Sequence, residues 1–244
     1  MRSSRSRAAE LERLGAVPFA HRGLHGHGRV ENSRAAFEAA VAAGHGIELD
    51  VQASRDGEAF VFHDYELERL TGEQGDLISH SARELREMAL LGTGEPLPTL
   101  TDVLQLVRSR VPILVEVKAP DRRVGRLCSA VMRSLEGYRG AVGVMSFNPE
   151  VPRWLAAHAP RILRGLVVTE HERRGLRGRA ERRLAFWRAR ADFIAYDIRD
   201  LPSRFATRRR RRGAPVFTWT VRSEEERARA AQHADQIIYE AAPA

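Results

Sequence analysis

Short apolar segments and longer amphipathic segments alternate along almost the whole chain, and this alternation restricts the fold more than any other feature. The apolar segments are expected to form strands at 16–20, 46–51, 59–63, 111–117, 141–146, 162–168, 192–197, 215–221 and 235–239. The amphipathic segments are expected to form helices at about 33–43, 99–110, 122–136, 149–158, 172–190, 202–211 and 223–233. Such alternation is typical of a parallel sheet in which helices carry the chain from one strand to the next.

A closed (β/α)8 barrel of the TIM type is favoured over an open doubly wound sheet, because about eight strand–helix units follow one another. The chain has 244 residues and no second zone of composition, so we expect a single domain over 1–244. Residues 1–15 are assigned to an N-terminal extension. Helix starts are expected at Thr101-Asp102 and at Ser223, which three glutamates follow.

One connection is too short for a helical crossover. Only the seven residues from Gln52 to Glu58 separate two of the apolar segments, and they include Asp56-Gly57, a pair common in tight turns. We therefore predict a hairpin over 52–63 above the barrel rim, not a ninth barrel strand. Residues 65–98 are then a small inserted piece of loop and helix after the second strand.

The basic residues are almost all arginine: of 40 lysines and arginines, Lys118 is the single lysine, and the formal charge is +8. This bias predicts a solvated basic face, with attraction to phosphate-bearing partners as the alternative. The densest run, Arg208–Arg212, is expected to be an exposed helix end. A lone cysteine, Cys128, excludes an internal disulfide. No segment approaches the roughly 20 apolar residues of a membrane span or forms a signal-peptide core, so we expect a cytoplasmic protein.

Two carboxylates share one face of the segment GIELDV. Side chains alternate along a strand, so Ile47, Leu49 and Val51 would pack against outer helices while Glu48 and Asp50 point into the barrel. Two ionised carboxylates are costly to bury side by side unless a cation accompanies them. A hard divalent ion such as Mg²⁺ or Ca²⁺ would remove that cost. A pair of surface acids on an edge strand is the alternative.

The segment VPILVEVK repeats this arrangement. Glu116 and Lys118 follow Leu114 on one face, at the strand end where barrel enzymes place their chemistry. An ammonium can bind phosphate as a compact charge or donate a proton, although a structural ion pair between Glu116 and Lys118 stays possible.

Histidine would supply acid–base chemistry at the same end. His21 follows the first strand and His63 ends the third apolar segment, so both could flank the carboxylates. Imidazole titrates near neutral pH and moves protons in either direction. His25 and His27 lie in a glycine-rich loop and are expected at the surface, near the site entrance.

The motifs resemble, in order and spacing, those of the glycerophosphodiester phosphodiesterase family over about residues 17–239. The matching residues are His21-Arg22-Gly23, Glu31-Asn32-Ser33, Ala36-Phe37, Glu48-Leu49-Asp50-Val51, Asp56-Gly57, His63-Asp64 and Glu116-Val117-Lys118, with weaker matches at 67–72, 98–104, 146–147 and 219–221.

This resemblance implies a phosphodiesterase barrel that uses one divalent cation, Mg²⁺ or Ca²⁺, to hydrolyse a small glycerophosphodiester to an alcohol and sn-glycerol 3-phosphate. It assigns the metal to Glu48, Asp50 and Glu116, and the acid–base pair to His21 and His63. It assigns phosphate contacts to Arg22 and Lys118, and a pocket wall to Trp219. The attacking oxygen could belong to water or to the glycerol hydroxyl of the substrate.

Two positions depart from the family pattern. Arg222 stands where many members have Asn, and the chain ends its last strand with Tyr239-Glu240 instead of Thr, an acidic residue and Arg-Pro. The expected effect is a different set of contacts to the glycerol or alcohol end.

Three other functions remain open at this point. A lysophospholipase D-type reaction on lipid substrates would use the same site, with transient contact to a membrane surface, but 65–98 offers no long apolar surface. A barrel that binds nucleic acid or another anion is disfavoured, because aromatic residues make up 7% of the chain and do not interleave with the basic runs. A non-catalytic regulatory barrel would not need His21 and His63.

Overall fold

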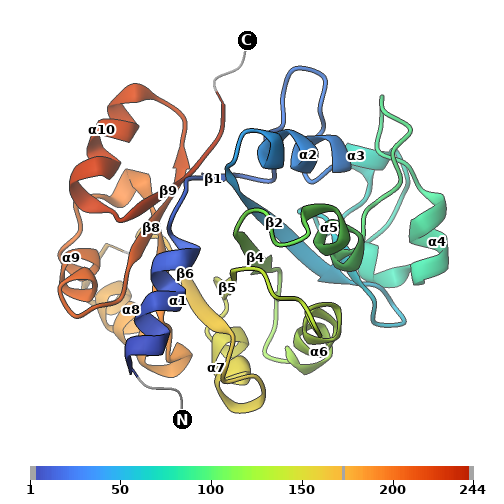
Figure 1. Cartoon of the computed structure of the whole chain (residues 1–244). Coiled ribbons are helices and arrows are strands. Elements are labelled where there is room, and N and C mark those ends of the chain that lie inside the picture. Colours follow the sequence, from blue (N-terminus) through green and yellow to red (C-terminus); the bar gives the residue numbers. More distant parts are fainter. Residues whose placement is uncertain (1–3, 172–173, 242–244) are drawn as a thin grey trace.

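The computed structural model describes residues 4–171 and 174–241, and in them eight parallel strands close into a barrel surrounded by helices (Figure 1). The barrel strands, in chain order, are β1 (Phe19–Ala20), β2 (Gly46–Ala53), β4 (Ile113–Val117), β5 (Val142–Ser146), β6 (Leu163–Val168), β7 (Phe193–Asp197), β8 (Val216–Val221) and β9 (Gln236–Tyr239). The ring closes because β1 pairs with both β2 and β9. The predicted (β/α)8 barrel is confirmed.

Helices connect consecutive barrel strands. They are α2 (Arg34–Ala42), α5 (Leu100–Val107), α6 (Gly125–Ser134), α7 (Glu150–His158), α8 (Leu176–Ala189), the short 3-10 helix η2 (Ile198–Asp200), α9 (Arg204–Arg210) and α10 (Glu224–His233). Ser223 precedes α10 and accepts a hydrogen bond from Glu226 N–H, as expected. The start of α5 is a correction: Thr99, not Thr101, is the N-cap, and it exchanges hydrogen bonds with Asp102.

The predicted hairpin is also present. The short strand β3 (Ala59–Val61) pairs with β2 in antiparallel orientation and lies outside the ring. Between it and α5, the chain forms α3 (Glu68–Thr71), the 3-10 helix η1 (Leu77–Ser79) and α4 (Ala82–Glu87). This piece has its own apolar cluster, which includes Phe60, Phe62 and Leu77. The insertion therefore packs as a small unit beside the end of β2.

The N-terminal residues form a helix that the sequence reasoning did not predict. Helix α1 (Ser4–Leu14) crosses in front of the strands in Figure 1. Its last residue, Leu14, is fully buried in the barrel interior with Phe19, Phe193 and Phe217. Arg7 ties the helix to the wall through an ion pair with Asp192. The extension thus covers the end of the barrel at which the strands begin.

The apolar core has an inner and an outer layer. Ile47, Leu49 and Val51 pack outward against the helices, in the cluster that also contains Val115 and Val117. Leu114 belongs to the interior cluster, so the predicted alternation of faces in β2 and β4 is confirmed. In the described part of the chain, no helix is long and apolar enough to cross a membrane.

Candidate active site

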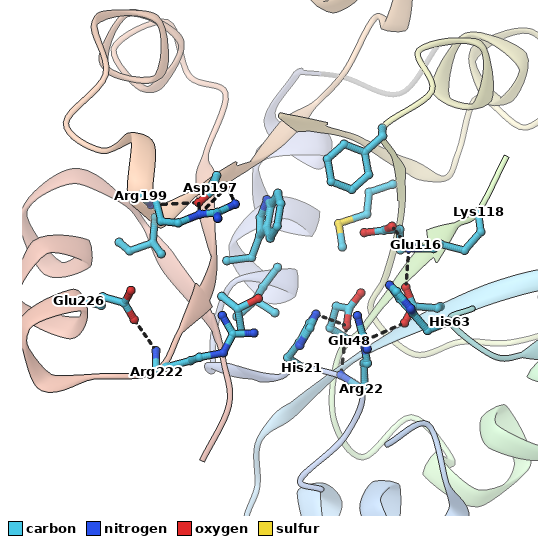
Figure 2. Close-up of a pocket in the computed structure, with 17 residues that line it drawn as sticks. His21, Arg22, Glu48, His63, Glu116, Lys118, Asp197, Arg199, Arg222 and Glu226 are labelled. Carbon is cyan, nitrogen blue, oxygen red and sulfur yellow. Dashed lines mark hydrogen bonds and ion pairs between the residues drawn. The ribbon is translucent and has the colours of Figure 1, made fainter. Parts of the chain in front are cut away.

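A cavity of about 320 Å³ opens at the end of the barrel where the strands finish. Figure 2 shows two groups of residues on opposite sides of it: His21, Arg22, Glu48, His63, Glu116 and Lys118 on one side, and Asp197, Arg199, Arg222 and Glu226 on the other. All eight residues predicted for the site lie in its lining: His21, Arg22, Glu48, Asp50, His63, Glu116, Lys118 and Trp219.

Three carboxylates form the floor on the acidic side. Glu48 and Asp50 come from β2, and Glu116 comes from the neighbouring β4, directly opposite Asp50 in the register. Their exposed fractions are 1%, 2% and 8%, and one oxygen of each lies within 4.8 Å of the others. Burial, together with the charges of Asp50 and Glu116, raises the pKa of Glu48 well above its ordinary range.

Two cations approach these carboxylates without balancing them. Lys118 Nζ lies 3.0 Å from Glu116 and 3.4 Å from Asp50, and Arg22 Nε lies 3.3 Å from Asp50. For Asp50, burial raises the pKa, but Lys118 and Arg22 outweigh that effect and lower it. With all three carboxylates ionised, three acids face two cations, so a negative charge is left in a buried place, and the raised pKa of Glu48 reflects this excess. The oxygen-only donor set fits a hard divalent cation, which would remove this excess.

The loop after β1 directs its polar groups at the same carboxylates. Arg22 has a left-handed φ of 55°, and its backbone N–H donates to Glu48 Oε2 at 3.1 Å. Gly23 follows with a φ of 79°, and a Cβ there would lie 2.9 Å from the side chain of Ala36. Only glycine therefore allows α2 to pack this closely.

Asn32 adds a contact from the start of α2. Its backbone N–H donates to Arg22 O at 2.9 Å, and its side-chain amide donates to Asp50 Oδ2 at 3.1 Å. Asn32 Oδ1 is buried and has no hydrogen-bond partner among the described residues. An unpaired acceptor beside the carboxylates is a second feature that a bound cation or its water shell would satisfy.

His21 is held through a chain of polar groups. Its Nδ1 lies 2.7 Å from Glu240 Oε1, and Glu240 in turn accepts from Arg222 at 2.6 and 3.0 Å. Burial raises the pKa of Glu240, but the hydrogen bonds from His21 and Arg222 outweigh it and bring the pKa to about 2. Burial lowers the pKa of His21, and the Glu240 contact opposes this only in part. An ionised Glu240 makes His21 Nδ1 the hydrogen-bond donor, and in the neutral ring Nε2 is then the acceptor.

His63 has a matching chain on the other side. Its Nδ1 lies 2.6 Å from Asp64 Oδ1, and Asp64 also accepts from Arg69. Burial raises the pKa of Asp64, but the hydrogen bonds from Arg69 and His63 bring it to about 2. Glu31 links Arg69 to Arg22, with distances of 2.7 and 2.8 Å. An ionised Asp64 makes His63 Nδ1 the donor and leaves Nε2 available.

The far side of the cavity is made by β7 and β8. Arg199 is fixed on the buried Asp197, with Nη2 at 2.6 Å from Oδ2. Trp219 donates its indole N–H to Ala195 O at 3.0 Å and meets Phe147 edge to face, with ring centroids 5.4 Å apart. Phe147 is 46% exposed, so this aromatic pair offers the cavity an apolar wall.

The structure also corrects and extends the predicted surroundings of the site. His27 is exposed as expected, but His25 is only partly exposed, and one of its ring nitrogens lies within 4.8 Å of the groups of His21 and Glu240. Arg222 and Glu240, expected to contact substrate, pair with each other. Asp64 could have been inferred from its place beside His63, whereas no local signal connects Glu240 with His21.

Comparison with known proteins finds a protein family and several relatives that this chain matches. The model of the glycerophosphoryl diester phosphodiesterase family matches residues 21–240. A Bacillus altitudinis glycerophosphodiester phosphodiesterase is 37% identical over 107 residues, which are 41% of this chain and 43% of that protein. A probable glycerophosphodiester phosphodiesterase 2 of Mycobacterium tuberculosis is 35% identical over 133 residues, 52% of this chain and 50% of that protein. The matches span about half the length of these curated relatives.

Solved structures agree over a greater length. An Oleispira antarctica phosphodiesterase, in complex with the product sn-glycerol-3-phosphate, superposes with a TM-score of 0.80 at 20% identity, covering 92% of this chain and 93% of that one. A Thermotoga maritima glycerophosphodiester phosphodiesterase gives 0.72 at 25% identity, covering 91% and 94%. Because the Oleispira antarctica protein is only 20% identical, its similarity to this chain shows the fold alone. Because the family model covers residues 21–240, which make up most of the chain and include every predicted site residue, the chain belongs to the glycerophosphoryl diester phosphodiesterase family.

Proposed function

We propose that the protein hydrolyses glycerophosphodiesters to an alcohol and sn-glycerol 3-phosphate in a reaction that needs one divalent cation. The observation that carries this proposal is the meeting of three buried carboxylates, two histidines and two cations in one cavity of a family member. The names of the matched relatives, and the product bound in the Oleispira antarctica structure, support the same reaction.

Glu48, Asp50 and Glu116 would hold the cation, Mg²⁺ or Ca²⁺, through carboxylate oxygens. When bound, such an ion supplies positive charge to the non-bridging oxygens of a phosphodiester. With the ion accounting for the excess negative charge, Arg22 and Lys118 keep donors for the phosphate. Burial lowers the pKa of Lys118, but Glu116 and Asp50 outweigh it and raise the pKa, so its amine remains charged. Both cations then stabilise charge that grows on phosphorus.

His21 and His63 would move the two protons of the reaction. Each has an Nδ1 held by an ionised carboxylate, which orients the ring and leaves Nε2 for chemistry. One histidine accepts the proton of the attacking oxygen, and the other protonates the departing alkoxide. The attacking oxygen belongs to water or to the glycerol hydroxyl. Trp219 and Phe147 would cover an apolar part of the substrate.

The test is the release of glycerol 3-phosphate from glycerophosphocholine and glycerophosphoethanolamine. Each substrate is assayed after EDTA treatment, and then with Mg²⁺ or Ca²⁺ restored. Release that EDTA abolishes and one metal restores would support both the reaction and the carboxylate site. Equal release in EDTA would contradict the metal requirement, and no release from a broad set of glycerophosphodiesters would contradict the reaction.

A further inference from the structure

A second concave surface, the arginine groove, lies between α8 and α9 and has a volume of about 660 Å³. Its lining includes eight arginines: Arg174, Arg179, Arg182, Arg183, Arg199, Arg204, Arg208 and Arg209. Two carboxylates, Glu170 and Asp200, belong to the same lining. The groove is therefore strongly cationic, and the arginine bias of the sequence is concentrated here.

Both carboxylates of the groove are already engaged. Glu170 accepts from Arg182 Nη2 at 2.8 Å and from Ser203 Oγ at 2.8 Å. Asp200 accepts from the backbone N–H of Glu170 and lies 3.3 Å from Arg174. These contacts build the floor of the groove and leave the carboxylates little capacity for more distant arginines.

Four arginines at the rim have no such partner. Among the residues that the structure describes, no carboxylate forms an ion pair with Arg179 or Arg183 of α8, or with Arg204 or Arg208 of α9; all four are exposed. Each pair is one helical turn apart, a spacing at which like charges on a helix repel each other. Two helices thus direct uncompensated positive charge at one groove.

Several exposed arginines on helices, Arg177 of α8 among them, pair with a carboxylate one turn away, as Arg177 does with Glu181 at 3.0 Å. Arg34 pairs with Glu38 on α2, and Arg229 pairs with Glu225 on α10, each one turn away. The four rim arginines lack such a partner among residues 4–171 and 174–241. Their positions around one groove indicate a surface suited to an external anion.

The groove adjoins the catalytic cavity. Arg199, which follows β7, belongs to the lining of both. Figure 2 shows Arg199 on the side of the cavity away from Glu48 and Glu116, with its guanidinium held by Asp197. A substrate whose scissile phosphate lies at Arg22 and Lys118 could therefore extend past Arg199 toward α8 and α9.

We propose that the arginine groove binds a second phosphate of the substrate, so that the preferred glycerophosphodiesters carry a phosphate monoester or a further phosphodiester on the alcohol part. This inference rests on the proposed function and adds the substrate class. Guanidinium groups bind phosphate oxygens in pairs of parallel hydrogen bonds, which suits phosphate better than an uncharged alcohol. Choline and ethanolamine head groups, which are cationic, would gain nothing from this surface.

The experiment compares glycerophosphoinositol with glycerophosphoinositol 4-phosphate, two substrates that differ by one phosphate. We expect kcat/KM to be about tenfold higher for the phosphorylated substrate, as one charge-assisted contact implies. In the double variant Arg183→Gln/Arg208→Gln this ratio should fall close to one, while turnover of glycerophosphoinositol stays unchanged. A wild-type ratio near one, or a ratio that survives the double substitution, would overturn the proposal.

The matched control is Arg139→Gln, an exposed arginine at the opposite end of the barrel, beside the start of β5. It should leave the ratio unchanged; an equal loss there would show a general charge effect and refute the groove. Thermal unfolding checks the fold of all variants. Removal of one arginine from each like-charged pair is expected to leave the melting temperature unchanged or slightly higher.

Binding separates this proposal from the proposed function. If neither substrate is hydrolysed, calorimetric binding of the same two compounds in EDTA decides on the groove, independently of the reaction. Tighter binding of the phosphorylated compound that depends on Arg183 and Arg208 upholds it, and equal binding refutes it. Sedimentation with phosphatidylserine vesicles tests the other source of phosphate. Vesicle binding that needs both arginines, without any substrate preference, would assign the groove to a lipid surface and overturn the proposal.

Discussion

The two histidines of the site are supported in the same way by different parts of the chain. His21 is joined to Glu240 and then Arg222, whereas His63 is joined to Asp64 and then Arg69. In each case a carboxylate fixes the ring, and an arginine fixes the carboxylate. The difference lies in distance along the chain. His63 and Asp64 are neighbours, but 219 positions separate His21 from Glu240.

Solvent access also separates the two. The side chain of His21 is 13% exposed and that of His63 is 29% exposed. His21 lies 3.9 Å from Glu48, inside the acidic floor, and its orientation depends on the closing strand β9. His63 is thus held by a neighbouring residue, whereas His21 is held by a residue that reaches it only when the barrel closes. The same ring orientation is obtained in two different ways.

Removing either ring should have the largest effect. His21→Ala and His63→Ala are each expected to lower kcat by about 10³-fold or more, because each removes one of two proton transfers. Both variants should remain folded with a small loss of stability, because each side chain lines a cavity but is also a hydrogen-bond partner of Glu240 or Asp64. His27→Ala, an exposed histidine of the same loop, is the control. Near-normal turnover in one of the two variants would show that only the other histidine moves a proton.

Glu48→Gln should weaken metal binding, since it changes the carboxylate that lies 3.9 Å from His21. Loss of one charged ligand is expected to raise the metal concentration for half-maximal activity by about 100-fold. The measurement is a titration of Mg²⁺ or Ca²⁺ against rate in metal-free enzyme. The control is Glu38→Gln on the exposed face of α2. An unchanged titration would remove Glu48 from the metal site.

The two supporting carboxylates provide a direct comparison. Glu240→Gln and Asp64→Asn are each expected to lower kcat by about 10- to 100-fold, because an amide can donate to Nδ1 and favour the wrong tautomer. The effect of Glu240→Gln should be the larger, since His21 is more buried. Glu240→Asp should restore part of the rate, and KM should change little. Equal losses of kcat would mean that the greater burial of His21 does not make it more dependent on its supporting carboxylate than His63 is.

The smallest effect concerns stability in acid. The pKa of Glu240 in the folded state is about 2, below its ordinary value of 4.5. Its stabilisation is therefore complete above pH 4.5 and is lost as the pH falls toward 2, because the unfolded chain binds the proton first. Allowing for solvent screening, Glu240→Gln should cost about 1–2 kcal/mol at pH 7.

Urea unfolding at pH 7, 5 and 3 checks this dependence. The wild-type and Glu240→Gln curves should approach each other at the lowest pH. Glu225→Gln, which removes an exposed partner of Arg229, is the control and should show almost no difference at any pH. A gap that stays constant with pH would show that lost packing, not charge, destabilises the variant.

Much of the fold and of the acidic floor could be predicted from local patterns. The two-residue period of GIELDV determines that Glu48 and Asp50 share a face, and parallel pairing then brings Glu116 opposite Asp50. The hairpin followed from a connection too short for a helix. These features depend on neighbours along the chain or on the general geometry of barrels.

The remaining features depend on contacts between distant segments. Helix α1 was not predicted because most of its residues are polar, so nothing in the sequence indicated that Leu14 enters the barrel interior. Arg209, expected in a solvated run, lies over the ring of Phe186 at 4.2 Å because α8 and α9 pack together. The partner of His21 was also hidden, since no sequence spacing connects residue 21 with residue 240.

The closing of the ring by β1 and β9 has a consequence for the order of events during synthesis. Phe19 and Ala20 pair with Ile238 and Tyr239, and the backbone N–H of His21 donates to Tyr239 O at 2.8 Å. The loop-closure entropy of nearly the whole chain must be overcome before these contacts form. A nascent chain therefore has no correctly held His21 until residue 240 has emerged from the ribosome. Catalytic activity would report that the chain has emerged past residue 240, and a ribosome stalled before that point would carry a barrel whose ring is still open between β1 and β9.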